Sequence, residues 1–133
     1  MGKMQCIVVT PEITLRDAEA EFVAVPLYDG ELGIGYNHSP MLGRIGNGEL
    51  RITNEGQVER YYVEGGFVEV KDNVISLLTQ RAVPAGSLNV AVATEQIEAA
   101  RQRPANTPEL MAIRDRAVSQ ARAQLRVAQR ALY

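Results

Sequence analysis

The stretch YDGELGIGYNHSP at residues 28–40 contains three glycines, one proline and the only histidine of the chain. A second glycine-marked stretch, YVEGGFVEV, follows at residues 62–70. Glycine adopts positive φ angles without a steric penalty, so such clusters mark tight turns between strands. The first stretch therefore predicts a backbone that turns sharply and presents a loop, and both stretches favour a β-rich fold.

Alternation of apolar and polar side chains supports this prediction in the surrounding sequence. Leu50 and Ile52 alternate with charged and hydroxyl residues, and the sequence TNEG at residues 53–56 is typical of a hairpin turn. Similar short apolar or alternating runs recur along the first 84 residues, with frequent turn signals between them. We expect six or more short strands in an antiparallel flattened β-sandwich or barrel, and no parallel α/β sheet.

The sequence changes character at PAGS, residues 84–87, which predicts a linker between a domain at 1–84 and a domain at 85–133. Asn89 is a suitable N-cap for a helix that ends near Arg103. Thr107 followed by proline is a strong start signal for a second helix. Because no glycine or proline interrupts residues 109–132, that helix has about 24 residues and a length of about 36 Å. The expected fold is therefore mainly β, with a C-terminal helical hairpin.

One face of the second predicted helix carries a thin, alanine-rich apolar stripe. Its members are Leu110, Ala117, Ala121, Leu125, Ala128 and Leu132. Alanine contributes little apolar area, so at about 25 cal/mol per Å² this face stabilises its contacts weakly. We expect a hairpin that can detach without unfolding the sandwich.

Net charge divides along the same boundary. The whole chain has a net charge of −2, which gives no reason to expect nucleic acid as a partner. Residues 1–84 hold seven basic and twelve acidic side chains, whereas residues 85–133 hold seven basic and four acidic ones. Opposite net charges on the two segments predict two surfaces with different partners.

Sequence patterns for catalysis, metals and nucleotides are weak or missing. His38 and Cys6 are the only residues of their kinds, so a catalytic triad or a zinc site would lack most of its members. The glycines at 30, 33 and 35 do not follow the order of a dinucleotide fingerprint, and there is no Walker lysine. We expect no enzyme activity, no metal and no cofactor. A single cysteine, with neither a secretory signal nor a run of about 18 apolar residues, indicates a cytoplasmic chain that meets a membrane only through a partner.

Basic side chains line one edge of the second predicted helix. Arg122, Arg126 and Arg130 are spaced by four residues, and Arg114 and Arg116 precede them by two turns. Only Glu109 and Asp115 accompany these five arginines. The edge is either a solvated helix face or a docking surface for an acidic partner.

Several segments in their order and spacing resemble the epsilon subunit of the rotary F-type ATP synthase. They are GELGI at residues 30–34, HSP at 38–40, GELRI at 48–52, GGFVEV at 65–70 and AQLRV at 123–127. The resemblance covers nearly the whole chain. It implies a non-catalytic central-stalk subunit of a proton-translocating enzyme, located peripherally at the cytoplasmic face of the bacterial cell membrane.

The resemblance also implies the partners and the residues that meet them. The gamma subunit and the membrane rotor ring would meet Gly30, Glu31, Leu32, Gly33, Ile34, His38 and Pro40, with Glu31 and His38 on one loop. The alpha/beta catalytic head would meet an extended tail through Arg114, Arg116, Arg122, Arg126 and Arg130, which would restrain ATP hydrolysis. A second hypothesis is a free-standing β-sandwich sensor that binds a small ligand and signals through its helices.

The chain departs from the resemblance at one site. Some members of that family bind ATP at the start of the first tail helix, through Ile or Leu, Asp, two residues, Arg and Ala. The matching positions here are Leu88, Asn89, Val90, Ala91, Val92 and Ala93. Both charged groups are missing, so we expect weak or no ATP binding.

Overall fold

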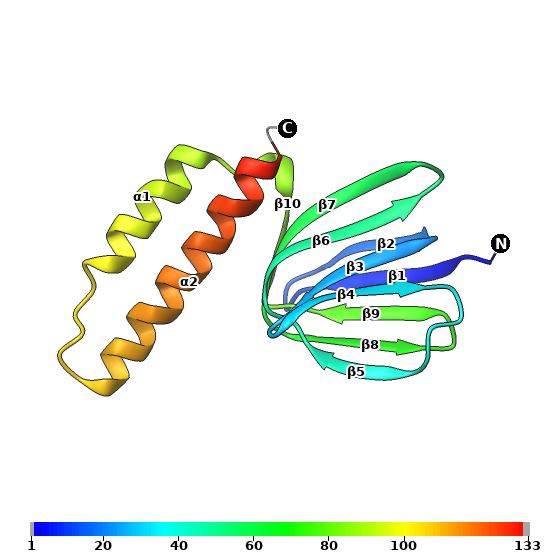
Figure 1. The fold of residues 1–133 in the computed structure, drawn as a ribbon, viewed down its shortest axis with the longest axis horizontal. Helices are drawn as coiled ribbons and strands as arrows, with labels where there is room; N and C mark the ends of the chain where they lie inside the picture. Colours follow the sequence, from blue (N-terminus) through cyan, green and yellow to red (C-terminus); the bar gives the residue numbers. More distant parts are fainter. Residues whose placement is uncertain (1, 132–133) are drawn as a thin grey trace. The chain divides into compact units, whose positions relative to one another are not determined.

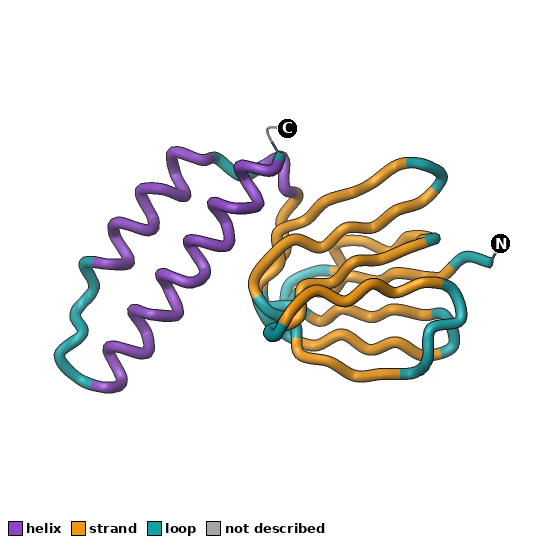
Figure 2. The backbone as a smooth tube through the Cα atoms, in the orientation of Figure 1, coloured by secondary structure: helices purple, strands orange, loops and turns teal. Residues whose placement is uncertain are grey.

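The computed structural model describes residues 2–131. The chain divides into two compact units, Met1–Pro84 and Ala85–Tyr133. The first unit consists of strands and the second of helices, as the colours of Figure 2 show. Each unit is described by itself.

Two five-stranded sheets form the first unit (Figure 1). Sheet A has the order β2-β1-β9-β8-β5, with β1 at Met4–Val9, β2 at Thr14–Ala20, β5 at Met41–Arg44, β8 at Phe67–Lys71 and β9 at Val74–Leu78. Sheet B has the order β10-β7-β6-β3-β4, with β3 at Phe22–Leu27, β4 at Gly30–Gly35, β6 at Asn47–Asn54, β7 at Gln57–Glu64 and β10 at Arg81–Pro84.

The predicted β-sandwich with a helical tail is confirmed, with three differences in detail. One strand pair, β1 with β9, is parallel rather than antiparallel. Strands β5 and β10 are only four residues long, too short for a visible alternation in the sequence. Residues 30–35 form strand β4 and not a loop, because β3 supplies a hydrogen-bonding partner along their whole length.

Alternate residues of both sheets point inward and form a single apolar core. Val23 and Val25 of β3 lie in one core cluster with Val68 and Ile75 of the other sheet, and all four are inaccessible to solvent. Cys6 lies in the same cluster. Burial raises the pKa of its thiol to about 12, so Cys6 remains protonated and acts as a small apolar side chain.

Gly66, between β7 and β8, is required by the backbone. Its φ angle is +100°, in the region that side-chain-bearing residues rarely adopt. A Cβ atom at this position would lie 1.8 Å from the carbonyl oxygen of Leu78. The pair of glycines in the GGFVEV segment therefore allows the chain to pass close to the end of β9.

A cluster of three polar side chains joins the edge strand β2 of sheet A to strand β7 of sheet B. Arg16 of β2 donates two hydrogen bonds of 2.8 Å to the carboxylate of Glu59 on β7. The hydroxyl of Tyr61 donates a third, of 2.7 Å, to the same carboxylate. The guanidinium of Arg16 lowers the pKa of Glu59, and burial followed by the bond to Glu59 raises the pKa of Tyr61 to about 12.

The second unit begins with a single 3-10 turn, η1 at Ala85–Ser87, at the position of the predicted linker. Helix α1 spans Val90–Arg101 and helix α2 spans Pro108–Arg130, and the two pack side by side (Figure 1). The side chains of Asn89 and Thr107 accept hydrogen bonds from the amides of Val92 and Leu110, both at 3.1 Å. These contacts are the N-caps that the sequence predicts.

The buried face of α2 is wider than the predicted stripe. Ala121 and Ala128 are buried as expected, whereas Leu110, Ala117 and Leu125 are half-buried. The additional buried residues are Ala123, Gln124 and Val127. Leu132, the last predicted member, lies outside the described residues.

Candidate partner-binding surfaces

Strand β4 presents half of its residues to solvent. Gly30, Glu31 and Gly33 are exposed, whereas Leu32 is half-buried and Ile34 is fully buried in the core. Ile34 therefore supports the strand from inside the sandwich, and its side chain cannot reach a partner. We call the exposed residues Gly30, Glu31 and Gly33 the β4 surface.

Glu31 is part of a charged network on the outer face of sheet B. Arg51 of β6 donates hydrogen bonds of 2.7 and 3.1 Å to the two carboxylate oxygens of Glu31. The same guanidinium donates a bond of 3.2 Å to Glu49, which also accepts one of 3.1 Å from Arg60. These bonds, chiefly the one to Glu31, raise the pKa of Arg51 above its ordinary value.

His38 lies in the loop between β4 and β5, which two asparagines hold in place. The backbone N–H of Asn37 donates to the side-chain oxygen of Asn73 at 2.7 Å, and the Asn73 side chain donates to Asn37 at 3.1 Å. Both asparagines have φ angles above +60°. The ring nitrogen Nδ1 of His38 lies 2.7 Å from the carbonyl oxygen of Ser39. The loop is therefore tied to the β8–β9 turn of sheet A.

Glu31 and His38 do not share a loop, contrary to the sequence-based expectation. Glu31 is the second residue of β4, and His38 follows the last residue of that strand by three positions. The segment from Glu31 to Gly35 alone spans about 13 Å in an extended strand. Pro40 is exposed and immediately precedes β5. The predicted residues therefore form two sites at opposite ends of β4.

An apolar patch on the outer face of sheet A has no counterpart among the predicted site residues. Leu42, Phe67 and Leu78 are 71%, 53% and 56% exposed. Phe67 is paired with Leu78 across β8 and β9, and Leu78 is paired with Val9 of β1. We call Val9, Leu42, Phe67 and Leu78 the sheet A patch. The sequence signal for this patch is an apolar residue at an outward-facing position of each of four strands, β1, β5, β8 and β9. The strands are too short for this signal to stand out from the alternation of apolar and polar residues.

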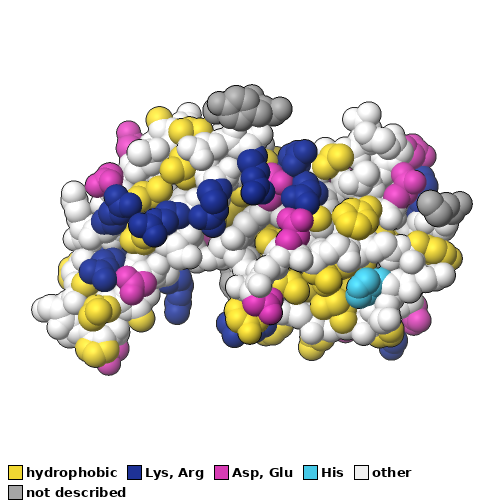
Figure 3. All heavy atoms as spheres, viewed as in Figure 1, with side chains coloured by type: hydrophobic (Ala, Val, Ile, Leu, Met, Phe, Trp, Pro, Cys, Tyr) yellow, Lys and Arg dark blue, Asp and Glu magenta, His cyan; other side chains and the backbone are white. Residues whose placement is uncertain are grey.

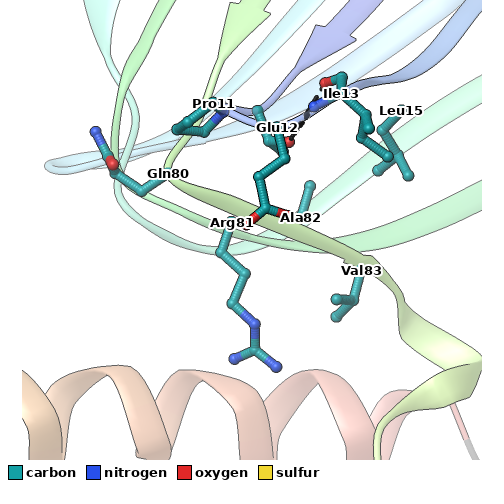
Figure 4. Close-up of a pocket in the computed structure, with 9 residues that line it drawn as sticks. Pro11, Glu12, Ile13, Leu15, Gln80, Arg81, Ala82 and Val83 are labelled. Carbon is teal, nitrogen blue, oxygen red and sulfur yellow. Dashed lines mark hydrogen bonds between the residues drawn. The ribbon is translucent and has the colours of Figure 1, made fainter.

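Two open hollows adjoin the same end of the sandwich. One, of about 370 Å³, is lined by Val9, Thr10, Pro11, Gly66, Phe67, Leu78, Thr79 and Gln80, and so borders the sheet A patch. The other, of about 440 Å³, lies between the turn from β1 to β2 and strand β10 (Figure 4). Glu12 and Arg81 are its only charged lining residues. Neither hollow holds the acid, base and nucleophile that covalent catalysis requires.

The five arginines predicted as a tail site all lie on α2. Arg116, Arg122, Arg126 and Arg130 are exposed, whereas Arg114 is half-buried and bonds Asp115 at 3.1 Å. Arg122 and Arg126 also line an open hollow of about 330 Å³ with Asp115, Val118 and Ser119. Figure 3 shows basic side chains gathered along the helical unit. We call Arg122, Arg126 and Arg130 the arginine edge.

Comparisons with known proteins identify the family. The family description "ATP synthase, Delta/Epsilon chain, beta-sandwich domain" matches residues 3–85. The ATP synthase epsilon chain of Rhodopirellula baltica is 48% identical over 92% of this chain and 96% of its own length. That of Symbiobacterium thermophilum is 43% identical over 77% of this chain and 75% of its own length.

The chain belongs to the ATP synthase epsilon chain family. Two solved structures of ATP synthases contain chains with the same fold. One, in the Euglena gracilis mitochondrial enzyme, has a TM-score of 0.85 at 18% identity and covers 100% of this chain and 83% of its own. The other, in the Tetrahymena thermophila mitochondrial enzyme, has a TM-score of 0.73 at 18% identity, with coverages of 96% and 97%.

As a member of the epsilon chain family, the protein is a non-catalytic subunit of ATP synthase. Residues 2–131 contain no group of three metal-binding side chains. Within the same range, no helix is both long enough and apolar enough to span a bilayer. At the position of the family's ATP-binding pattern, the Asn89 side chain is engaged as the N-cap of α1 and Val92 is 48% exposed. Weak or absent ATP binding stays a prediction.

Proposed function

We propose that this epsilon-family chain couples rotation of the rotor ring to ATP synthesis in the central stalk of a proton-translocating F-type ATP synthase. Its place would be peripheral, at the cytoplasmic face of a bacterial cell membrane. Membership of the epsilon chain family carries this proposal. The two structural relatives, one from an assembly of OSCP, F1 and c-ring and the other from a central stalk with its c-ring, agree with it.

The sheet A patch is the proposed binding surface for the gamma subunit. Large apolar side chains that are contiguous and exposed mark a protein interface more often than a free surface. The patch is continuous with an open hollow, which gives a partner side chain a place to insert. Aromatic side chains such as Phe67 supply much of the binding free energy in interfaces of this kind.

Substitution in the patch tests this assignment. Phe67→Glu should weaken the affinity of the full chain for a purified gamma subunit by about tenfold or more, because a charge would be buried at the interface. Val58→Glu is the matched control, since Val58 is 45% exposed on β7 and lies outside the patch. Titration calorimetry gives both affinities. Equal affinities for the two variants would remove the patch from the interface.

The β4 surface and the His38 loop are the proposed contacts with the rotor ring, together with Pro40. Polar and glycine-rich backbone at the edge of a sheet can approach another polar surface closely. Glu31→Gln should lower the number of protons pumped per ATP hydrolysed by the reconstituted complex. A ratio equal to that of the wild type would exclude Glu31 from the ring contact.

For the helical unit we propose a second role, restraint of ATP hydrolysis by docking of the arginine edge on an acidic surface of the catalytic head. The exposure of Arg122, Arg126 and Arg130 and the shallow hollow beside them support this assignment. Guanidinium groups at such an edge would form charge-assisted bonds with carboxylates. Helices that dock in this way act as two-state elements.

Removal of residues 86–133 tests the second role and should raise the ATPase activity of the assembled complex. Replacement of the three edge arginines by glutamate should raise it similarly, whereas Arg103→Glu, an exposed change outside α2, should not. Steady-state ATP hydrolysis measures all three. If the triple variant hydrolyses ATP at the wild-type rate, the edge is a solvated helix face.

A further inference from the structure

We infer that Arg51 is a positioning residue that fixes the Glu31 carboxylate in the orientation in which the β4 surface meets the ring. The inference rests on the proposed ring contact of Glu31. It assigns a role in that contact to a residue that is not itself on β4.

The geometry of the pair is bidentate and crosses an intervening strand. β3 lies between β4 and β6 in sheet B. Arg51 pairs with Ala24 of β3, and Pro26 of β3 pairs with Glu31. Ala24 has only a methyl side chain, so the long side chain of Arg51 can pass over it to reach β4. Both oxygens of Glu31 then accept bonds, at 2.7 and 3.1 Å.

This bidentate bond restricts the rotamers that the Glu31 side chain can adopt. The Glu31 side chain is 48% exposed, whereas that of Arg51 is only 27% exposed. An isolated exposed glutamate samples several rotamers, and ordering it on binding reduces affinity. Arg51 removes most of this freedom before the partner arrives, and it leaves the outer sides of the Glu31 carboxylate accessible.

Burial of Glu49 does not depend on Arg51 alone. The Glu49 side chain is 2% exposed and accepts bonds from both Arg51 and Arg60. Arg60 therefore supplies one cation to this buried carboxylate, and within residues 2–131 it forms no bond to Glu31. Nη1 of Arg51 donates to both Glu49 and Glu31, whereas Nη2 donates to Glu31 at 2.7 Å. Burial of the core residues does not require the bonds to Glu31. A role in presenting Glu31 accounts for this contact.

The test compares Glu31→Gln, Arg51→Gln, the double variant and Arg60→Gln, each as a full-length chain in the reconstituted complex. The measured quantity is the ratio of protons pumped to ATP hydrolysed. Arg51→Gln should lower this ratio as much as Glu31→Gln does, and the double variant should lower it no further. Arg60→Gln should leave it within about twofold of wild type, since Arg60 bonds Glu49 and not Glu31, and the two bonds from Arg51 to Glu31 remain.

Arg51→Lys is included because Arg51→Gln could unfold the sheet. Lysine keeps the positive charge beside Glu49 but cannot form a planar bidentate bond. Thermal melting identifies which variants fold, and Arg51→Lys carries the test if Arg51→Gln does not. A lowered ratio for the folded variant supports the inference, and a wild-type ratio overturns it.

The two hypotheses fail in different ways. If Glu31→Gln lowers the ratio and Arg51→Lys and Arg51→Gln leave it unchanged, the positioning role is wrong and the ring contact stands. If the effects of Arg51→Gln and Glu31→Gln add in the double variant, Arg51 acts independently of Glu31 and the inference is also wrong. If Glu31→Gln has no effect, the ring contact itself is wrong.

Discussion

The sandwich and the helical hairpin are stabilised by different means. Among the described residues, the buried hydrophobic side chains of the sandwich are mostly valine, isoleucine and leucine, with two alanines, Ala20 and Ala24. In the hairpin, five of the eight buried residues are alanines: Ala93, Ala100, Ala121, Ala123 and Ala128. Since stabilisation scales with the apolar area removed from water, each buried position of the hairpin contributes less. The sandwich therefore removes more apolar area from water per buried position than the hairpin does.

The largest expected effect is on the backbone of the sandwich. Gly66→Ala should destabilise it by about 4 kcal/mol or more, because the residue has φ of +100° and its Cβ would collide with a carbonyl. Gly86→Ala is the control, since a Cβ there meets nothing within 4 Å. Urea unfolding measures both changes. If both variants lose a similar free energy of unfolding, the close approach of Gly66 to the Leu78 carbonyl is not the reason that position 66 needs glycine.

Matched core truncations compare the two units directly. Leu77→Ala in the sandwich should cost about 3 kcal/mol, and Ile97→Ala in α1 about 2 kcal/mol. Four of the five tyrosines, Tyr28, Tyr36, Tyr61 and Tyr62, lie in the sandwich unit, so tyrosine fluorescence reports chiefly its unfolding, while circular dichroism at about 222 nm reports the helices. Ile97→Ala should shift only the helical signal. A shared shift of both signals would mean that the units unfold as one.

The smallest expected effect is the pH dependence of the stability that the Arg16–Glu59 ion pair between the two sheets contributes. Arg16 lowers the pKa of Glu59 in the folded chain, so the link stabilises the fold above the unfolded pKa of about 4.3. This stabilisation is lost as the pH falls through the lower, folded pKa. Because both side chains are more than a third exposed, solvent screening limits it to about 1 kcal/mol.

Arg16→Gln should therefore lower the free energy of unfolding at pH 7 by about 1 kcal/mol or less, and the difference from wild type should disappear near pH 2. Urea unfolding at both pH values gives the comparison. Arg44→Gln is the control, because Arg44 lies on β5 and has no contact with Glu59 in the described structure. A difference that persists unchanged at low pH would assign the loss to packing of the Arg16 side chain.

Local sequence signals predicted the helices and most of the strands. Thr107 and the proline after it mark the first turn of α2, because an N-cap needs only neighbouring residues. The same reasoning failed at residues 30–35, where glycines indicated a loop. Those residues form a strand because β3 pairs with them along their whole length. Strand pairing depends on the partner strand as well as on the residues of the segment itself.

The candidate site was predicted less completely than the fold. The segment motifs indicated Glu31 and His38, but not that β4 separates them. They also gave no sign of the sheet A patch, because Leu42, Phe67 and Leu78 come from three different strands and share one face of the sheet only through the pairing of β5, β8 and β9. Likewise, Arg51 and Glu31 are 20 residues apart.

The sequence by itself determined the fold class, the two helices with their caps, the opposite charges of the two segments and the family resemblance. These properties depend on local pattern and composition. Only the tertiary structure decided which exposed side chains lie together, that Ile34 is buried, and that Arg51 holds Glu31. Sheet register controls all three, and register is set by the cooperative packing of strands across the whole sandwich.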